Sequence, residues 1–350
     1  MKHPVDARRD AVALRDPAQP DCPTDDILRV EDLSIWFATG AGEVQAVRDV
    51  SFTVRAGEAV GMVGESGCGK SITGLAVMRL LETPPARVEG RVLFKGRDLL
   101  QLPEREMQTL RGSAVSMVFQ DPMTAIDPVF TVGRQIAETV RAHRGLDKKQ
   151  SREAAIDMLA SVGIPLPRQR FDEYPHQLSG GMRQRVMIAM ALSCEPSLLI
   201  ADEPTTAVDV TIQAQILELL RRLSEQHGTA VLFITHDLGV VAEFCSRVLT
   251  MYAGEIVENA GVDALLTAPR HPYTSGLLQA IPRVANRGRP LQSIRGRVPS
   301  PADMPSGCRF HPRCDHVKEP CSQRQQLLSV GPEQSARCCR ASELDLPGAL

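Results

Sequence analysis

The sequence has no run of about twenty apolar residues, which is the length that a membrane-spanning helix requires. No charge of one sign dominates either, since 40 Lys and Arg residues nearly balance 42 Asp and Glu residues and leave a formal net charge of −2. A chain without a strongly basic surface is not expected to bind nucleic acid through many phosphate contacts. The N-terminal stretch lacks the apolar core of a secretory signal peptide. These absences predict a protein that stays in the cytoplasm and has no nucleic-acid partner.

The composition, 43% hydrophobic and 23% charged over 350 residues, suits a large α/β domain with an appendage. Residues 1–25 lack apolar periodicity, and we predict a disordered tail there. Residues 26–270 contain the alternating and continuous apolar runs typical of antiparallel and parallel strands. Within them, residues from about 123 to 180 show only helical signals and predict a helical insertion. Residues 271–350 hold clustered cysteines and several prolines, which predict a small irregular C-terminal domain.

A glycine-rich loop lies between a predicted buried strand at residues 59–63 and a stretch of helical spacing at residues 72–81. Its pattern, G-x-x-x-x-G-K-S, is that of a phosphate-binding loop. Glycines allow successive backbone N–H groups to turn toward a polyphosphate, and the helix that follows directs its positive end there. The residues of the loop are Gly64, Glu65, Ser66, Gly67, Cys68, Gly69, Lys70 and Ser71, and Ile72 follows them. The alternative is a turn that binds no ligand, which the Lys-Ser pair disfavours.

Several polar residues follow apolar runs typical of buried parallel strands, and ligands of α/β proteins bind at the carboxyl ends of such strands. These residues are Gln120, the adjacent pair Asp202 and Glu203, and His236. Two carboxylates at this edge are expected near a Mg²⁺-bound phosphate. Each residue has a simpler interpretation by itself, since an Asp-Glu pair can cap a helix and a single histidine is often structural.

Two further stretches suggest nucleotide contacts. Ser179, Gly180 and Gly181 stand directly before a predicted helix, which makes a second anion-binding helix start. Trp36 and Phe37 lie at the end of a predicted strand, where an aromatic ring can stack on adenine or can simply pack in the core. The sequence leaves both interpretations of the two aromatic residues open.

Together these motifs resemble the ATP-binding subunits of ABC transporters, over about residues 27–270 and in the order of that family. The phosphate loop is similar to the Walker A motif, and residues 198–204 are similar to Walker B. Residues 178–182 resemble the family signature, with Met182 in place of the commoner Gln. The further positions that match are Gln120 of the Q-loop, Asp209 of the D-loop and His236 of the switch. The resemblance implies a P-loop ABC ATPase core with an antiparallel β-subdomain and a helical insertion.

The resemblance also implies a role for each side chain in ATP hydrolysis. Lys70 and the loop amides would hold the β- and γ-phosphates, and Glu203 would polarise the attacking water as general base. His236 would contact the γ-phosphate and orient that water. The Mg²⁺ ligands implied are Ser71, Gln120 and Asp202. In the family, the signature residues Ser179, Gly180 and Gly181 contact ATP on the opposite subunit, so a second ABC ATPase chain, identical or related, is the expected partner.

Residues 271–282 resemble the C-terminal motif of oligopeptide/dipeptide importer ATPases. This implies a peripheral subunit at the cytoplasmic face of the inner membrane, with two membrane permeases and an extracytoplasmic substrate-binding protein as partners. Relatives with this tail serve nickel, glutathione or opine uptake, so those substrates stay open. A soluble ABC ATPase acting on DNA or ribosomes would share the nucleotide motifs, but the short insertion and near-neutral charge disfavour it. Glu203, the general base that the resemblance implies, argues against a regulator that binds nucleotide without hydrolysing it.

Five of the nine cysteines lie in the last 43 residues, and in a reducing compartment such a cluster indicates a metal site more often than disulfides. The four that match the tail of peptide-importer ATPases are Cys308, Cys314, Cys321 and Cys338. Some of those ATPases hold a [4Fe–4S] cluster there, which is the interpretation that the resemblance favours. Zn²⁺, with His311 or His316 as substitute ligands, and unligated thiols are the alternatives. Cys339 is expected to take no part.

Overall fold

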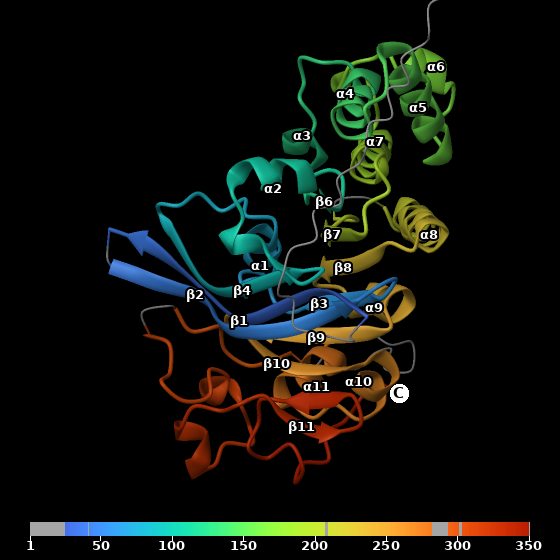
Figure 1. Cartoon of the computed structure of the whole chain (residues 1–350). Helices are drawn as coiled ribbons and strands as arrows, with labels where there is room; N and C mark the ends of the chain where they lie inside the picture. Colours follow the sequence, from blue (N-terminus) through green and yellow to red (C-terminus); the bar gives the residue numbers. More distant parts are fainter. Residues whose placement is uncertain (1–24, 41, 207–208, 282–292, 301–302, 350) are drawn as a thin grey trace, which may run out of the picture.

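The computed structural model describes residues 25–40, 42–206, 209–281, 293–300 and 303–349. Residues 1–24 lie outside these ranges, so the prediction of a disordered tail at residues 1–25 is not tested. The described chain forms two sheets with helices packed around them (Figure 1).

The N-terminal half contributes an antiparallel sheet of four strands in the order β2-β1-β4-β5. Its strands are β1 (Asp26–Thr39), β2 (Gly42–Arg55), β4 (Ala86–Phe94) and β5 (Arg97–Asp98). Apolar residues alternate along β1, and those that point inward, such as Leu28 and Val30, are buried against the main sheet. The antiparallel strands predicted from the alternation before the phosphate loop are therefore confirmed.

The main sheet has eight strands in the order β11-β12-β10-β9-β3-β8-β7-β6. The strands β6 (Val115–Val118), β7 (Leu198–Asp202), β8 (Ala230–Thr235), β3 (Ala59–Val63) and β9 (Arg247–Tyr252) are parallel. Each is a short, nearly continuous apolar run, because helices or the antiparallel sheet cover both faces. On β8, Val231 and Phe233 face one core cluster while Leu232 and Ile234 face the other.

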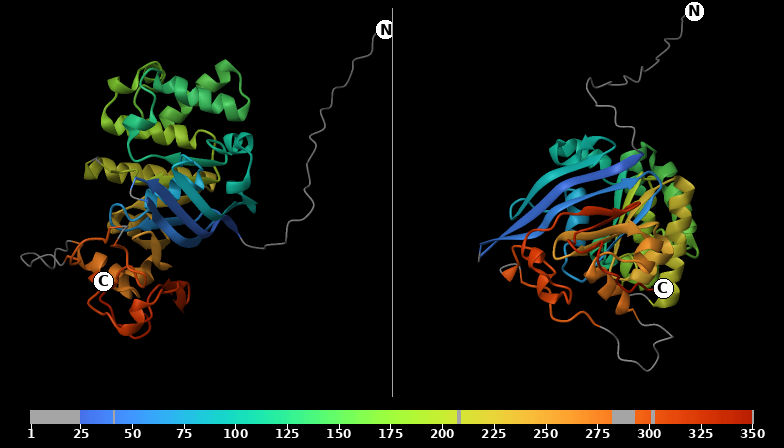
Figure 2. Two further views of the ribbon diagram at one scale, coloured as in Figure 1. Left: turned by 90° about the vertical axis from the view of Figure 1, so that its left-hand side faces the viewer. Right: turned by 90° about the horizontal axis from the view of Figure 1, so that it is seen from below.

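The helical insertion predicted at about residues 123–180 lies at one end of the molecule, away from the C-terminal segment (Figures 1 and 2). It consists of α3 (Pro122–Ala125), α4 (Val132–Arg144), α5 (Lys148–Ser161), α6 (Pro167–Arg170) and the turn η2 (Pro175–Gln177), and leads into α7 (Gly180–Leu192). The remaining helices of the core are α1 (Lys70–Val77), η1 (Leu99–Gln101), α2 (Glu104–Leu110), α8 (Val210–His227), α9 (Leu238–Phe244) and α10 (Val262–Thr267).

The C-terminal part is less irregular than the sequence predicts. Strand β10 (Glu255–Gly261) turns antiparallel to β9, and α11 (Pro272–Gln279) follows it. The hairpin β11 (Leu328–Gly331) and β12 (Gln334–Ala336) then pairs with β10 and extends the main sheet. The cysteine region itself is made of loops and the short turns η5 (His311–Arg313) and η6 (Glu319–Ser322). Among the described helices, none combines the length and apolar character that crossing a membrane requires.

Candidate functional site

The phosphate loop joins the end of β3 to the first residue of α1, as its sequence predicts. Three of its glycines, Gly64, Gly67 and Gly69, have positive φ values of 154°, 78° and 104°. A side chain at Gly64 would be excluded, since its Cβ would lie 2.1 Å from the carbonyl oxygen of Met251. The glycines are therefore required by backbone conformation and close packing as well as by the expected ligand.

Lys70 is the first residue of α1 and its side chain folds back over the loop. Its ammonium donates to the carbonyl oxygens of Gly64 at 2.8 Å and Glu65 at 3.1 Å, and only 4% of the residue is exposed. The charge thus lies inside the curve of the loop, where phosphate oxygens could replace these carbonyl partners. The most exposed loop residues are Ser66 and Gly67, at the crest between β3 and α1.

Ser71 and Asp202 meet across the gap between α1 and the end of β7. The hydroxyl of Ser71 donates to Oδ1 of Asp202 at 2.9 Å, and Asp202 is 5% exposed. Burial raises the pKa of the Asp202 carboxyl, an effect that the Ser71 hydrogen bond opposes. A buried carboxylate and a hydroxyl are ligand types that suit Mg²⁺, and a bound cation would relieve the cost of burying the charge. The donor set therefore fits the metal expected here.

Glu203 lies at the centre of a polar cluster that joins three strand ends. Its Oε2 accepts hydrogen bonds from Gln120 at 3.1 Å and from Thr206 at 2.7 Å. Nδ1 of His236 lies 3.3 Å from Oε1. Burial raises the pKa of Glu203, but the hydrogen bonds of Thr206 and His236 outweigh it, so the pKa is lowered. The side chain is thus held as an acceptor, the form that a general base requires.

Thr206 is a site residue that the sequence analysis missed. It stands just after the Walker B stretch and three residues after Glu203, a spacing at which a side chain can reach back to the preceding turn. Glu203 itself has a φ of 45°, a conformation rare for residues other than glycine. The Thr206 hydrogen bond and the backbone bond from Glu203 N–H to the carbonyl of Ile234, at 2.8 Å, hold it in place.

The signature residues and Asp209 lie at the starts of two helices. Ser179 caps α7 by accepting a hydrogen bond from the N–H of Met182 at 3.3 Å, and Asp209 caps α8 by accepting one from Ile212 at 2.9 Å. Gly180 is exposed, and a Cβ at Gly181 would lie 3.3 Å from the Ile212 side chain. Both caps present polar groups at helix N-termini on the surface, as expected of residues that contact a nucleotide on another chain.

The two aromatic candidates lie on opposite faces of β1. The Arg87 guanidinium covers the ring of Trp36, with Cζ 3.9 Å from the centroid, while Phe37 is half-buried and packs against the core beneath the antiparallel sheet. Ile72 also packs against that core.

The predicted cysteine ligands share one small cavity of about 20 Å³, lined by Cys308, Cys314, Cys321 and Cys338 together with His271, His311 and His316. Cys339 does not line it, although its Sγ lies 3.7 Å from that of Cys321. Burial, with a smaller contribution from the nearby thiols, raises the pKa of Cys308 to about 12. Within the described ranges, no three His, Cys, Asp or Glu side chains are placed to hold a metal ion.

Comparison with known proteins identifies the family. Residues 47–206 match the ABC transporter family, and residues 257–321 match the oligopeptide/dipeptide transporter C-terminal region. The chain is 49% identical over 321 residues to the oligopeptide transport ATP-binding protein OppD of Salmonella typhimurium, which covers 92% of this chain and 96% of that protein. It is 48% identical over 304 residues to the dipeptide transport ATP-binding protein DppD of Escherichia coli, covering 87% and 93%. The chain belongs to the ABC transporter family, and it is an ABC ATPase.

Solved structures agree with this assignment of the ABC ATPase. The dimeric ATP-binding cassette MJ0796 bound to ADP and Pi superimposes with a TM-score of 0.60 and 27% identity, over 67% of this chain and 98% of that chain. The protein cbiO1 from Clostridium perfringens, part of the ABC transporter complex cbiONQ, gives a TM-score of 0.57 and 26% identity, over 69% of this chain and 90% of that chain. The predicted fold class is therefore confirmed.

Proposed function

We propose that this ABC ATPase powers the uptake of dipeptides and oligopeptides across the cytoplasmic membrane. The observation that carries the proposal is the polar cluster at one edge of the main sheet, where a phosphate loop, a Ser71–Asp202 pair and the carboxylate of Glu203 come together. The similarity to OppD and DppD over most of the chain supports the peptide class of substrate. The same arrangement would serve an importer for nickel, glutathione or opines.

Within this proposal each side chain has one task. Lys70 and the amides of residues 64–71 hold the phosphates of ATP. Ser71, Asp202 and Gln120 hold Mg²⁺, which supplies charge neutralisation at the phosphate oxygens. Glu203 accepts the proton of the attacking water, and His236 orients that water. The hydrogen bonds from Gln120 and Thr206 to one carboxylate oxygen support this role, because they fix the orientation of the carboxylate that accepts the proton.

The proposal includes a second ATPase subunit that completes the site. Ser179, Gly180, Gly181 and Asp209 lie at exposed helix starts and are proposed to contact the nucleotide of that subunit. The dimeric state of the MJ0796 cassette supports this arrangement. Two membrane permeases and an extracytoplasmic binding protein complete the proposed assembly, with this chain peripheral at the cytoplasmic face. The division into a nucleotide-binding domain up to about residue 270 and a C-terminal domain belongs to the same proposal, as does stacking of Trp36 or Phe37 on adenine.

The experiment is purification of the tagged chain from its own membranes in mild detergent. Two permeases and a second ATPase are expected to co-purify. After reconstitution with the binding protein, a tripeptide should stimulate ATP hydrolysis and enter the vesicles. Stimulation by nickel, glutathione or an opine but not by peptides would contradict the peptide class. Co-purification with ribosomes or DNA instead of permeases would overturn the transport function.

We also propose that Cys308, Cys314, Cys321 and Cys338 hold a [4Fe–4S] cluster. The support is their shared cavity, the right number of thiols and the presence of Arg340 beside them, whose charge would offset an anionic centre. A bound metal would lower the thiol pKa values that burial raises.

Protein purified without oxygen should be brown and contain about four iron and four sulfide per chain, and Cys314→Ser should lose the colour. Cys339→Ser, the matched control outside the cavity, should keep it. Colourless protein with one zinc per chain, or no metal in a fully stable protein, would reject the cluster.

A further inference from the structure

Residues of the C-terminal segment, which we define as residues 271–350, form hydrogen bonds with the phosphate loop. Arg313, at the end of η5, directs its guanidinium at the carboxylate of Glu65, 248 positions earlier in the chain. Nη1 lies 2.6 Å from Oε2 and Nη2 lies 3.0 Å from Oε1, so the contact is bidentate. Two parallel charge-assisted bonds fix the orientation of both groups. Glu65 is thereby tied to a part of the chain that the nucleotide motifs do not include.

Arg313 is buried and is held in place by several contacts. Its side chain is 3% exposed, and Nε donates to the carbonyl oxygen of Arg295 at 2.9 Å. The guanidinium also lies within 5.7 Å and 6.0 Å of the ring centroids of Tyr252 and Phe310. The pairing with Glu65 raises the pKa of Arg313 above its ordinary value, so the group is charged at any working pH. A buried arginine with these contacts cannot turn away from Glu65 without losing several of them.

The backbone of Glu65 is held by the same segment. Its N–H donates to the phenolic oxygen of Tyr273 at 2.9 Å, and Tyr273 on α11 is fully buried. Tyr252, Tyr273 and Phe310 pack against one another with centroids 4.7 to 5.5 Å apart, which fixes the hydroxyl. Both the side chain and the amide of one loop residue therefore depend on the C-terminal segment.

A second contact holds the far side of the loop. The N–H of Gly254, in the turn between β9 and β10, donates to the carbonyl oxygen of Cys68 at 2.9 Å. The guanidinium of Arg309 donates to the carbonyl of Ala253 in that turn. The loop is thus supported at Glu65 directly and at Cys68 through the turn.

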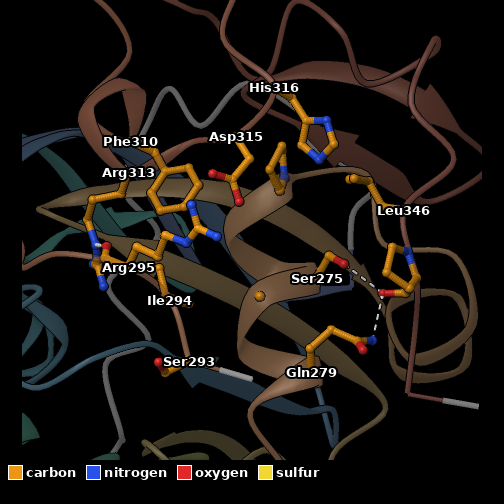
Figure 3. A pocket seen from close by; sticks show the side chains of 13 residues that line it. Ser275, Gln279, Ser293, Ile294, Arg295, Phe310, Arg313, Asp315, His316 and Leu346 are labelled. Atoms are coloured by element: carbon orange, nitrogen blue, oxygen red, sulfur yellow. Dashed lines mark hydrogen bonds between the residues drawn. The ribbon is translucent and has the colours of Figure 1, made fainter. Parts of the chain in front are cut away.

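Figure 3 shows Arg313, Phe310 and Arg295 grouped at one side of a cavity, with Ser275 and Gln279 of α11 at another. The cavity of about 450 Å³ lies between α11 and the cysteine region. Arg313 both lines this cavity and binds Glu65. It is therefore one residue through which a change in the C-terminal segment would reach the phosphate loop.

We propose that Arg313 is a positioning residue for ATP binding, which acts by holding and neutralising Glu65 in the phosphate loop. The main-chain oxygen of Glu65 lies 3.1 Å from Nζ of Lys70, so this residue borders the place where the triphosphate binds. Without Arg313 the carboxylate of Glu65 would repel the phosphates and the loop would lose its anchor. The C-terminal segment then contributes to ATP binding.

The test is a double-mutant cycle on the full chain, with binding of the fluorescent analogue MANT-ATP in the presence of Mg²⁺ as readout. Arg313→Met is expected to weaken binding about tenfold, and Glu65→Gln to weaken it by about threefold to tenfold. Because the two residues act through each other, the double variant should be no more than about threefold weaker than the weaker single variant. In ATPase assays KM should rise by a larger factor than kcat falls.

Lys318→Met is the control, because Lys318 lies in the same segment but pairs with Glu343 at 3.1 Å on the surface rather than with the loop. Its affinity for MANT-ATP should be within about twofold of the affinity of the unchanged protein. Wild-type affinity in Arg313→Met would overturn the proposal. So would a double variant whose loss equals the product of the two single losses, since that result means independent structural effects.

Tyr273→Phe keeps the test usable if Arg313→Met does not fold. This change retains the ring packing and removes only the acceptor for the Glu65 N–H. The expected loss of MANT-ATP affinity is about threefold to tenfold, corresponding to one hydrogen bond. Unchanged affinity in a folded Tyr273→Phe protein, together with unchanged affinity in Glu65→Gln, would reject the role of this contact.

Discussion

Replacing Glu203 by glutamine removes one negative charge and changes the geometry little. In the structure Oε2 accepts from Gln120 and Thr206, and Oε1 faces His236. A glutamine can keep an amide oxygen toward Gln120 and Thr206 and place its NH₂ group toward His236. The amide cannot accept a proton from water, because it has no basic lone pair at neutral pH. The variant therefore removes the base and leaves the side chains around it in place.

The size of the effect follows from the role of a general base, which contributes about 10² to 10⁴ in rate. We expect kcat for ATP hydrolysis to fall by that factor. Nucleotide affinity should change by less than about threefold, because Lys70, Ser71 and the loop amides are untouched. An ATP-bound dimer should accumulate, since binding persists while turnover stops.

The assay compares single-turnover hydrolysis in the assembled transporter with MANT-ATP binding. Glu58→Gln is the matched control, because Glu58 is also a half-buried carboxylate but lies just before β3, at the opposite end of that strand from the loop. It should hydrolyse ATP within about twofold of the unchanged rate. A rate in Glu203→Gln within about tenfold of wild type, measured in the same assembly, would refute the assignment of Glu203 as the base.

Three further outcomes are expected. Glu58→Gln should lower the free energy of unfolding by about 1–3 kcal/mol at pH 7. Hydrogen bonds from Arg247 and Arg55 outweigh burial and lower the pKa of Glu58, so the difference in stability should disappear as the pH falls through this lowered pKa. Thermal melts at several pH values measure this, and an unchanged difference at low pH would contradict it. Gly64→Ala should abolish MANT-ATP binding, since its Cβ would lie 2.1 Å from the carbonyl of Met251; binding within about threefold of wild type would show that the loop can relax. Dilution of the chain should lower ATPase activity per chain, and Ser179→Ala should lower it at every concentration; a fast, concentration-independent monomer would exclude a shared site.

The sequence determined the local parts of this ABC ATPase. Each of these parts is encoded by a few consecutive residues, so its pattern is visible in the linear chain: the phosphate loop, the apolar strand before it and the helix start at Ser179. The sequence also placed Gln120 and Glu203 at the carboxyl ends of predicted parallel strands, which meet at one edge of the sheet, and in the structure the two side chains are hydrogen-bonded there.

The tertiary structure alone decided which distant residues support these parts. Nothing in the sequence marks Tyr273 or Arg313 as partners of Glu65, because the pairing depends on how α11 and η5 pack against β9 and the loop. The same holds for the hairpin β11–β12, whose short strands lack a clear alternating pattern and form because β10 offers an unpaired edge. Long-range contacts of this kind depend on packing in three dimensions, which residue spacing does not encode.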